Sequence, residues 1–387
     1  TIFVYAEFVT GSITETDTIC YNTQSNIINT IIPPTGGNIP YLYSWESSTD
    51  TGSSWNTIPF SNSDSFDAGI LTETTYYRVL YISSSNCGVL YSNTSQIVVL
   101  PQVDAGSIIS DQFLCYDSLA FDLTVDSSAS GGNGSYNYQW QYNISGSWND
   151  IIAATTIVYS PGYMNISTYY RLEVTSAYDT NCISRNTYHV YVHVYDSLEA
   201  GILSSDQFIC YNTIPDVITF SSLPQGADGN YRYQWQYRVD TTSWTDIIGE
   251  TTDSLQPLSL LETTYYRLVV TSVFGCGIKI TEPVKITVYD EFITGSITVT
   301  DTICYNTQSD IINTIIPPTG GNMPYSYIWQ SSFDNGSSWS SIPSNDFDSL
   351  DAGILLDTTY YRVLYISSSN CGSLYSNTSQ IVVLPQV

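Results

Sequence analysis

The sequence predicts an all-β protein made of four tandem β-sandwich domains. Three observations support this prediction: a set of landmark residues recurs four times, apolar and polar residues alternate with a period of two, and no segment shows the apolar spacing of a helix. Hydrophobic residues occupy 42% of the 387 positions, which is enough to build a buried core in each domain.

The charge balance excludes several classes of partner. The chain carries 36 acidic and 9 basic residues, so its formal net charge is −27. A protein this acidic lacks the cations that bind nucleic acid non-specifically or hold a protein on an anionic membrane surface. No apolar run reaches the roughly 18 residues of a membrane span. We therefore expect neither nucleic-acid binding nor direct membrane insertion.

Cysteine and tryptophan positions define the repeat. The cysteines alternate between long spacings of 66 or 67 residues and short spacings of 28 residues. A second tryptophan opens a W-x-x-I motif in each copy, and a Tyr-Tyr-Arg element follows it. The first tryptophan of each copy lies 25 residues after the first cysteine, and we expect it in the core at Trp45, Trp140, Trp235 and Trp329.

The domain boundaries follow from these landmarks. Residues 1–8 align with the end of the third copy, so we expect them to be the last strand of a preceding repeat. The first and fourth copies differ at 18 of 94 positions after a shift of 284 residues. We interpret the chain as a window cut from a longer array. The four repeats are expected at 9–103, 104–197, 198–291 and 292–387.

Period-two alternation places the strands within each repeat. Tyr136, Tyr138, Trp140 and Tyr142 share one face, with polar residues between them, which is typical of a half-buried antiparallel strand. In the first copy the turn after this strand reads Asp-Thr-Gly at 50–52, which favours a hairpin. A strand with the second tryptophan, a Tyr-Tyr-Arg strand and a closing strand complete the predicted sandwich.

The start of the Tyr-Tyr-Arg strand reads L-x-x-x-T-x-Y in three copies, with Met164 replacing leucine in the second. This pattern resembles the tyrosine corner of immunoglobulin-like and fibronectin type III sandwiches, where a tyrosine hydroxyl bonds to upstream backbone. An ordinary core aromatic is the alternative. The tyrosines at this position are Tyr77, Tyr170, Tyr266 and Tyr361.

The cysteines predict one disulfide per domain. Pairing within each copy is favoured because every copy carries one pair, whereas pairing across the 28-residue spacing would leave Cys20 and Cys371 without a partner. Two cysteines with no repeated histidine nearby do not supply a zinc site. An even cysteine count indicates an oxidising, extracytoplasmic location. The predicted disulfide cysteines are Cys20, Cys87, Cys115, Cys182, Cys210, Cys276, Cys304 and Cys371.

No catalytic constellation is visible, so the sequence predicts no enzyme and no cofactor. His189 and His193 share one strand face, which suits either a metal pair or two solvent-facing residues. Asp346, Asp348 and Asp351 lack the ligand spacing of a dedicated calcium site. We expect neither a catalytic nor a metal site.

Each Tyr-Tyr-Arg element supplies one arginine. We expect this side chain to face outward and to pack over an aromatic ring of the neighbouring strand, worth about 0.5–1 kcal/mol if exposed. A ligand-binding role is the alternative. The four arginines are Arg78, Arg171, Arg267 and Arg362.

These motifs together resemble a known family. The unit of C-x24-W, W-x-D-I-I, T-Y-Y-R and a late cysteine is similar to the Ig-like repeats of giant Bacteroidota cell-surface adhesins, such as the SprB-type gliding-motility adhesin. The resemblance implies type IX secretion and display as a long filament on the exterior of the outer membrane. It also implies partners: neighbouring repeats, the secretion and motility machinery, and a surface polysaccharide or abiotic substratum.

The same resemblance suggests O-glycosylation, because Bacteroidota modify Asp-Ser/Thr followed by an aliphatic residue or threonine. Candidate acceptors are Thr18, Ser118, Ser197, Thr241, Ser254, Thr302, Ser349 and Thr358.

Short connections between repeats predict an elongated rod. We therefore expect a non-enzymatic stalk segment of a cell-surface adhesin. Two alternatives remain open: an array of carbohydrate-binding modules that uses exposed aromatics such as Tyr76 and Tyr169, and a subunit of a structural extracellular filament.

Overall fold

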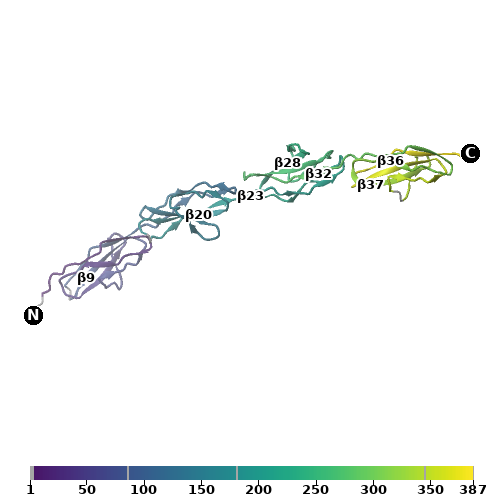
Figure 1. Ribbon diagram of the computed structural model, residues 1–387. Helices are drawn as coiled ribbons and strands as arrows, with labels where there is room; N and C mark the ends of the chain where they lie inside the picture. The colour runs from purple at the N-terminus through teal and green to yellow at the C-terminus, as the bar shows by residue number, and fades with distance from the viewer. Residues whose placement is uncertain (1–3, 85–86, 180–181, 344–345, 387) are drawn as a thin grey trace. The chain divides into compact units, whose positions relative to one another are not determined.

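A computed structural model of the chain describes residues 4–84, 87–179, 182–343 and 346–386. These residues form β-strands and no α-helix, so none of them builds a helix that could cross a membrane. Residues 1–195 and 196–387 form two compact units, and each unit holds two repeats. Figure 1 follows the strands of the repeats from purple at the N-terminus to yellow at the C-terminus.

The strands recur in the same order in the first, second and fourth repeats, whereas the third has an extra strand pair near its start and only isolated bridges at Thr213–Leu260 and Ile218–Leu255. The first repeat contains β1 (Ser12–Ile13), β2 (Thr16–Ile19), β3 (Thr23–Gln24), β4 (Ile28–Ile32), β5 (Tyr41–Ser48), β6 (Asn56–Thr57), β7 (Ser65–Phe66), β8 (Ile70–Leu71), β9 (Thr75–Ser83), β10 (Val89–Tyr91) and β11 (Ser95–Val99). The second contains β12 (Ser107–Ile108), β13 (Gln112–Leu114), β14 (Ser118–Leu119), β15 (Leu123–Ser127), β16 (Tyr136–Asn143), β17 (Asn149–Asp150), β18 (Val158–Tyr159), β19 (Tyr163–Met164), β20 (Thr168–Ser176), β21 (Arg185–Asn186) and β22 (Val190–Val194). The third contains β23 (Asp196–Glu199), β24 (Ile202–Leu203), β25 (Gln207–Ile209), β26 (Phe220–Ser222), β27 (Gln225–Ala227), β28 (Tyr231–Val239), β29 (Thr245–Asp246), β30 (Thr264–Ser272), β31 (Ile278–Ile280) and β32 (Val284–Val288). The fourth contains β33 (Ser296–Ile297), β34 (Thr300–Cys304), β35 (Thr307–Gln308), β36 (Ile312–Ile316), β37 (Asn322–Ser332), β38 (Ser340–Ser341), β39 (Ser349–Leu350), β40 (Ile354–Leu355), β41 (Thr359–Ser368), β42 (Ser373–Tyr375) and β43 (Ser379–Leu384).

Each repeat is a sandwich of a large sheet and a smaller one. In the first repeat the large sheet has the order β2-β11-β9-β5-β6, with β10 paired to β9, and β1-β4-β7 forms the second layer. The first two strands of the repeat belong to different layers, because β1 pairs antiparallel with β4 while β2 pairs parallel with β11. The same large-sheet order recurs in the other three repeats.

The core forms where the inner faces of the two sheets meet. Along β9, Tyr77, Val79 and Tyr81 are buried and alternate with more exposed residues, as the sequence alternation predicts. The four predicted core tryptophans have no exposed surface, and each indole Nε1 donates a 2.9 Å hydrogen bond to a backbone carbonyl. Burying the ring while satisfying its N–H explains why this tryptophan recurs in every copy.

The residues that precede the first repeat pack on it. Residues 4–8, expected to belong to the last strand of a preceding repeat, form no strand, and residues 1–3 lie outside the described part of the chain. A β-strand requires a hydrogen-bonded neighbour. Phe8 instead packs against the core of the first repeat and stacks on Tyr41 with ring centroids 5.7 Å apart.

The tyrosine-to-backbone bonds that the structure describes are made by a different tyrosine from the one in the corner pattern. The four predicted corner tyrosines are buried, and burial raises the pKa of Tyr170 to about 12, but the Tyr170 hydroxyl donates to Sδ of Met164 at 3.6 Å. The bond to upstream backbone is made by the first tyrosine of the long strand, which donates to a glycine carbonyl five residues before it at 2.7–2.9 Å. These pairs are Tyr41 to Gly36, Tyr136 to Gly131, Tyr231 to Gly226 and Tyr325 to Gly320.

Candidate functional site

The strand directions decide which residues meet at the junction between repeats. In the first repeat β2 and β11 run parallel, with Ile19 opposite Val99, so Cys20 lies at the end where the chain leaves for the next repeat. Strand β9 runs antiparallel to β11, so the loop with Cys87 lies at the other end. The nine residues of β9 separate these ends by about 26 Å, because a strand rises roughly 3.3 Å from each residue to the next.

The disulfides therefore connect consecutive repeats, which corrects the predicted pairing within each copy. Cys20 bonds Cys182 with Cα atoms 5.3 Å apart, and Cys210 bonds Cys371 with Cα atoms 5.1 Å apart. These separations suit a disulfide, whereas the length of a sandwich does not. In both bonds the first cysteine of one repeat meets the second cysteine of the next.

The remaining four cysteines divide into two groups. Cys115 and Cys276 are disulfide-bonded. Among the described residues, Cys87 and Cys304 carry free, exposed thiols, so the prediction that every cysteine is paired is wrong for these two. The sequence spacing could not show this, because it contains no information on which end of a sandwich each loop occupies.

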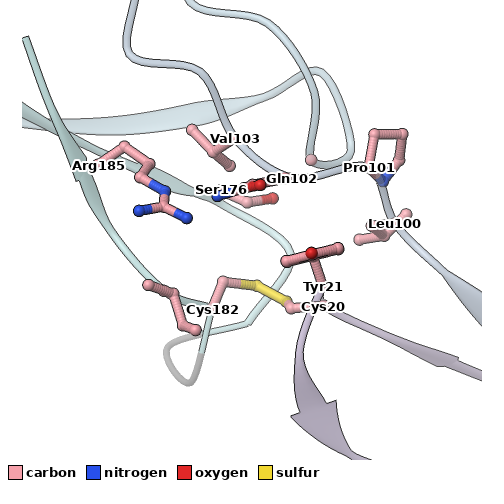
Figure 2. Close-up of a pocket in the computed structure, with 11 residues that line it drawn as sticks. Cys20, Tyr21, Leu100, Pro101, Gln102, Val103, Ser176, Cys182 and Arg185 are labelled. Carbon is pink, nitrogen blue, oxygen red and sulfur yellow. A yellow bond between two sulfur atoms is a disulfide. The ribbon is translucent and has the colours of Figure 1, made fainter. Parts of the chain in front are cut away.

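Figure 2 shows the junction between the first two repeats, with Cys20 and Tyr21 from the first facing Cys182 and Arg185 from the second. These residues and the linker that includes Pro101 enclose a space of about 20 Å³. Such a space holds a single water molecule and no small-molecule ligand. The junction is therefore a packed contact between domains and not a binding pocket.

Hydrogen bonds reinforce this junction. The Tyr178 hydroxyl of the second repeat donates to the Thr18 carbonyl of the first at 2.9 Å. With its amide oxygen turned toward Arg185, Gln102 of the linker accepts hydrogen bonds from that guanidinium. A disulfide, a side-chain bond and the peptide linker thus cross the same junction.

Each linker is also fixed to the repeat that follows it. The backbone N–H of the second residue of a Gly-Gly pair donates to the linker carbonyl at 2.7–2.8 Å in three repeats: Gly37 to Ala6, Gly132 to Pro101 and Gly321 to Asp290. The preceding glycine has a positive φ, and a Cβ there would collide with a linker carbonyl. This applies to Gly36 against Glu7, Gly131 against Gln102, Gly226 against Ser197 and Gly320 against Glu291. Only glycine permits this close approach of linker and loop.

The outer face of the large sheet carries the repeated arginines. Each guanidinium lies over the second tryptophan of its repeat, with distances to the ring centroid of 4.2 or 4.3 Å: Arg78 over Trp55, Arg171 over Trp148, Arg267 over Trp244 and Arg362 over Trp339. The predicted packing of arginine on an aromatic ring is confirmed. In the first repeat Arg78 also forms an ion pair with Glu46 at 2.7 Å.

The second repeat has a continuous aromatic row on this face. Neighbouring ring centroids along Trp148, His189, Tyr169, Tyr191 and His193 are 6.1, 5.2, 4.4 and 5.5 Å apart. The two histidines thus contact aromatic rings, and in the described part of the chain no group of three or more His, Cys, Asp or Glu side chains could hold a metal ion.

The acidic cluster of the fourth repeat does not converge on one point. Asp346 and Asp348 are exposed. Asp351 Oδ1 accepts hydrogen bonds from Gln308 Nε2 at 2.6 Å and from the Gly353 backbone N–H at 2.9 Å, so this carboxylate stabilises a local turn.

The candidate glycosylation residues all lie at positions with solvent access. Ser197, Thr241 and Thr302 are exposed, and the other five are half-buried. The Thr358 hydroxyl accepts a hydrogen bond from the Val383 backbone N–H at 3.1 Å.

Comparison with known proteins bears on the repeat. A family model described as "Domain of unknown function (DUF8696)" matches residues 9–101, 104–196, 199–290 and 293–385. No match to the sequence was found among curated proteins. Solved structures with some similarity include immunoglobulin domains 1–5 of Sidekick-1, at 11% identity over 98% of this chain and 81% of that chain, with a TM-score of 0.35.

Two further solved structures are comparably distant. The three N-terminal domains of the bacteriophage RB49 Highly Immunogenic Outer Capsid protein share 13% identity over 74% of this chain and 100% of that chain, with a TM-score of 0.35. The N-terminal four Ig domains of Dscam1 isoform 6.9 share 10% identity over 97% and 100%, with a TM-score of 0.27. Similarities at this level say nothing about function. Because the four consecutive matches of the family model cover almost the whole chain, the chain belongs to the family Domain of unknown function (DUF8696) and contains four of its repeats.

Proposed function

We propose that these repeats are a non-enzymatic stalk segment of a large bacterial cell-surface adhesin, which holds an adhesive surface away from the cell. The observation that carries this proposal is the double covalent connection between consecutive repeats, by the linker and by the disulfide Cys20–Cys182 or Cys210–Cys371. A second connection restricts bending at the junction, which serves a spacer and has no use in an independent domain. The packed interior of the junction between the first two repeats leaves no room for a ligand.

The disulfides also support an extracellular location, because such bonds form and persist in oxidising compartments. A net charge of −27 opposes side-by-side association of neighbouring copies. The resemblance to adhesins of gliding bacteria supports a location on the exterior of the outer membrane and export by type IX secretion. Neighbouring repeats, the motility machinery and a polysaccharide or abiotic substratum are then its partners.

Antibody labelling of intact cells that produce the protein tests the proposal. We expect antibodies raised against the four repeats to label unpermeabilised cells, and deletion of the repeats to reduce attachment to glass several-fold. Labelling only after permeabilisation would contradict a surface stalk. Surface labelling of the intact protein, together with unchanged attachment after the repeats are deleted, would contradict only the proposed role in adhesion.

Carbohydrate binding is a second candidate, and the aromatic row of the second repeat favours it. Tyr169 is 39% exposed and stacks on Tyr191, so the row offers aromatic surface of the kind that sugar rings contact. A glycan array probed with the intact chain tests this candidate. Binding that the Tyr169→Ala variant loses, while Tyr163→Ala on another strand retains it, would support a lectin-like role.

A further inference from the structure

Two cysteines stand outside the disulfide pattern. Cys87 is the second cysteine of the first repeat and Cys304 is the first cysteine of the fourth, and both thiols are free and exposed among the described residues. Their equivalents 284 residues away, Cys371 and Cys20, are both in inter-repeat disulfides. We propose that Cys87 and Cys304 are complementary half-sites of a further inter-repeat disulfide. Cys87 forms a disulfide with the first cysteine of another repeat of this family, and Cys304 forms one with the second cysteine of another repeat.

The half-site at Cys304 has the same local structure as the paired one at Cys20. Segments 16–25 and 300–309 are identical in sequence. At each, the threonine three residues after the cysteine donates its hydroxyl to the cysteine carbonyl at 2.7 Å. The asparagine directly before this threonine has a φ of 59° at Asn22 and 63° at Asn306. The loop that presents Cys304 is therefore already formed.

The half-site at Cys87 matches the paired one at Cys371 in the same way. Segments 74–88 and 358–372 are identical in sequence. The backbone N–H of Ser83 donates to the Gly88 carbonyl at 3.2 Å, and that of Ser367 donates to the Gly372 carbonyl at 3.0 Å. The two glycines have φ of 126° and 124°. The described residues on either side of Cys87 therefore have the same backbone arrangement as those beside the paired Cys371.

The surroundings of Cys87 are open where those of a bonded junction are closed. Tyr5, Phe8, Cys87 and Val89 help to line a crevice of about 480 Å³, compared with about 20 Å³ at the Cys20–Cys182 junction. The crevice lies between the N-terminal segment and the loop after Cys87, so its position corresponds to that of the linker and loop of a bonded junction. The occupant that fits it is the end of another repeat of this family.

The bond forms by thiol–disulfide exchange with a small disulfide such as oxidised glutathione. The Cys304 thiolate attacks this disulfide, forming a mixed disulfide and releasing one glutathione thiolate. The thiolate of the partner, which is the second cysteine of another repeat, then attacks the Cys304 sulfur and releases the second glutathione thiolate. Two protein thiols are oxidised to one disulfide, the oxidant is reduced to two thiols, and the two released protons return to the glutathione thiolates.

A second copy of the chain is the probe for both half-sites. We expect the disulfide-intact protein in a glutathione redox buffer to form head-to-tail oligomers on non-reducing electrophoresis, joined through Cys87 of one copy and Cys304 of another. Mixing Cys87→Ser with Cys304→Ser, each carrying a different tag, should stop at one heterodimer in at least tenfold excess over either homodimer. Neither substitution breaks an existing disulfide, and circular dichroism checks that both variants fold.

Random oxidation of exposed thiols gives a different result. A heterodimer in only twofold excess over each homodimer, or no cross-linked product at all, would overturn the proposal. Protein isolated from cells with thiols blocked beforehand identifies the natural partner by mass spectrometry. A Cys304 peptide linked to a repeat of the same chain indicates a continuous array, a Cys87–Cys304 peptide indicates joined copies, and blocked thiols at both positions would contradict the proposal.

This inference does not depend on the adhesive role. Head-to-tail bonding in protein that fails to label intact cells would leave the inference standing and remove the proposed function. Surface labelling of cells whose protein carries blocked thiols at Cys87 and Cys304 would support the proposed function and contradict this inference.

Discussion

Individual hydroxyl groups fix the loop that receives each linker. Tyr136 donates to the Gly131 carbonyl at 2.9 Å, and the same bond recurs in the other three repeats. This bond connects the start of the long strand to the glycine pair that contacts the linker. Its fourfold recurrence indicates that it holds the loop in the shape that the linker requires.

Replacing Tyr136 by phenylalanine removes this bond and keeps the ring. We expect the second repeat to lose about 0.5–1.5 kcal/mol of unfolding free energy, the net value of a typical intramolecular hydrogen bond. Urea unfolding followed by tryptophan fluorescence measures the change. Tyr163→Phe is the control, because Tyr163 is 73% exposed, and an equal loss in this variant would contradict the assigned role.

Two carboxylates make the hairpins of the first and fourth repeats sensitive to acid. Hydrogen bonds from Ser48 and Ser54 lower the pKa of Asp50 from 3.8 to about 2, and bonds from Ser338 and Ser332 do the same for Asp334. A carboxyl group whose pKa is lowered by folding stabilises the protein above pH 3.8. That stabilisation disappears as the pH falls from 3.8 toward 2.

The variant with both Asp50→Asn and Asp334→Asn tests this titration. Its melting temperature should lie below that of the wild type at pH 7, and the difference should shrink between pH 4 and pH 2, where the wild-type carboxylates become protonated. Calorimetry across this range measures the difference. Glu282→Gln at an exposed position controls for the change in net charge, and a pH-independent difference would show that the carboxylates act in another way.

At the scale of elements, the contact between linker and glycine loop positions one repeat on the next. Gly131 and Gly134 both have φ of 80°, but a Cβ at Gly131 would meet the Gln102 carbonyl, while a Cβ at Gly134 would have nothing within 4 Å. Comparing alanine substitutions at Gly131 and Gly134 therefore separates the backbone cost of a positive φ from the steric cost of displacing the linker.

Gly131→Ala should release the linker, and Gly134→Ala should not. Both variants incur the cost of roughly 1–2 kcal/mol of a left-handed conformation at a non-glycine residue. Only Gly131→Ala should also make the linker near Pro101 more sensitive to protease, by several-fold in the rate of cleavage. Equal rates for the two variants would show that the glycine loop does not hold the linker.

Features repeated in each copy could be predicted from the sequence. The fully buried tryptophans and the arginine packing over Trp148 follow from fourfold recurrence and strand alternation, because each depends on residues within one sandwich. The tyrosine-to-glycine bond was missed, although the recurring G-[GA]-[ND]-x-x-Y pattern was visible. The L-x-x-x-T-x-Y pattern of a later strand pointed instead to the corner tyrosine.

The disulfide pairing could not be predicted because it depends on strand direction. Cys20 and Cys87 lie in the same repeat, but the parallel pairing of β2 with β11 places them at opposite ends of the sandwich. Spacing along the chain does not distinguish a parallel neighbour from an antiparallel one. The sequence therefore identified the residues of the junction and assigned them to the wrong partners.

At the scale of the whole molecule, the disulfides couple domains that could each fold alone. Each repeat has its own core cluster, and the bond Cys20–Cys182 joins the loops of two sandwiches without entering either core. Its contribution to stability thus comes from restricting the unfolded chain over 162 residues.

Replacing both Cys20 and Cys182 by serine should leave the β-sheet circular dichroism unchanged at room temperature. The free energy of unfolding of the first two repeats should fall by roughly 2–5 kcal/mol. The control replaces Cys87 and Cys304, which removes two cysteines without breaking a bond. A loss of sheet signal in the first variant, or an equal destabilisation in the control, would contradict independent folding of the two sandwiches.

The inter-repeat disulfides also determine how the chain responds when its ends are pulled. Residues between Cys20 and Cys182, and between Cys210 and Cys371, lie inside covalent rings, so tension bypasses them even if their sandwiches unfold. Reducing the first bond frees 162 residues, or about 550 Å of extended chain at roughly 3.4 Å per residue. Oxidation therefore makes these repeats nearly inextensible, and reduction changes the same chain into a long elastic tether.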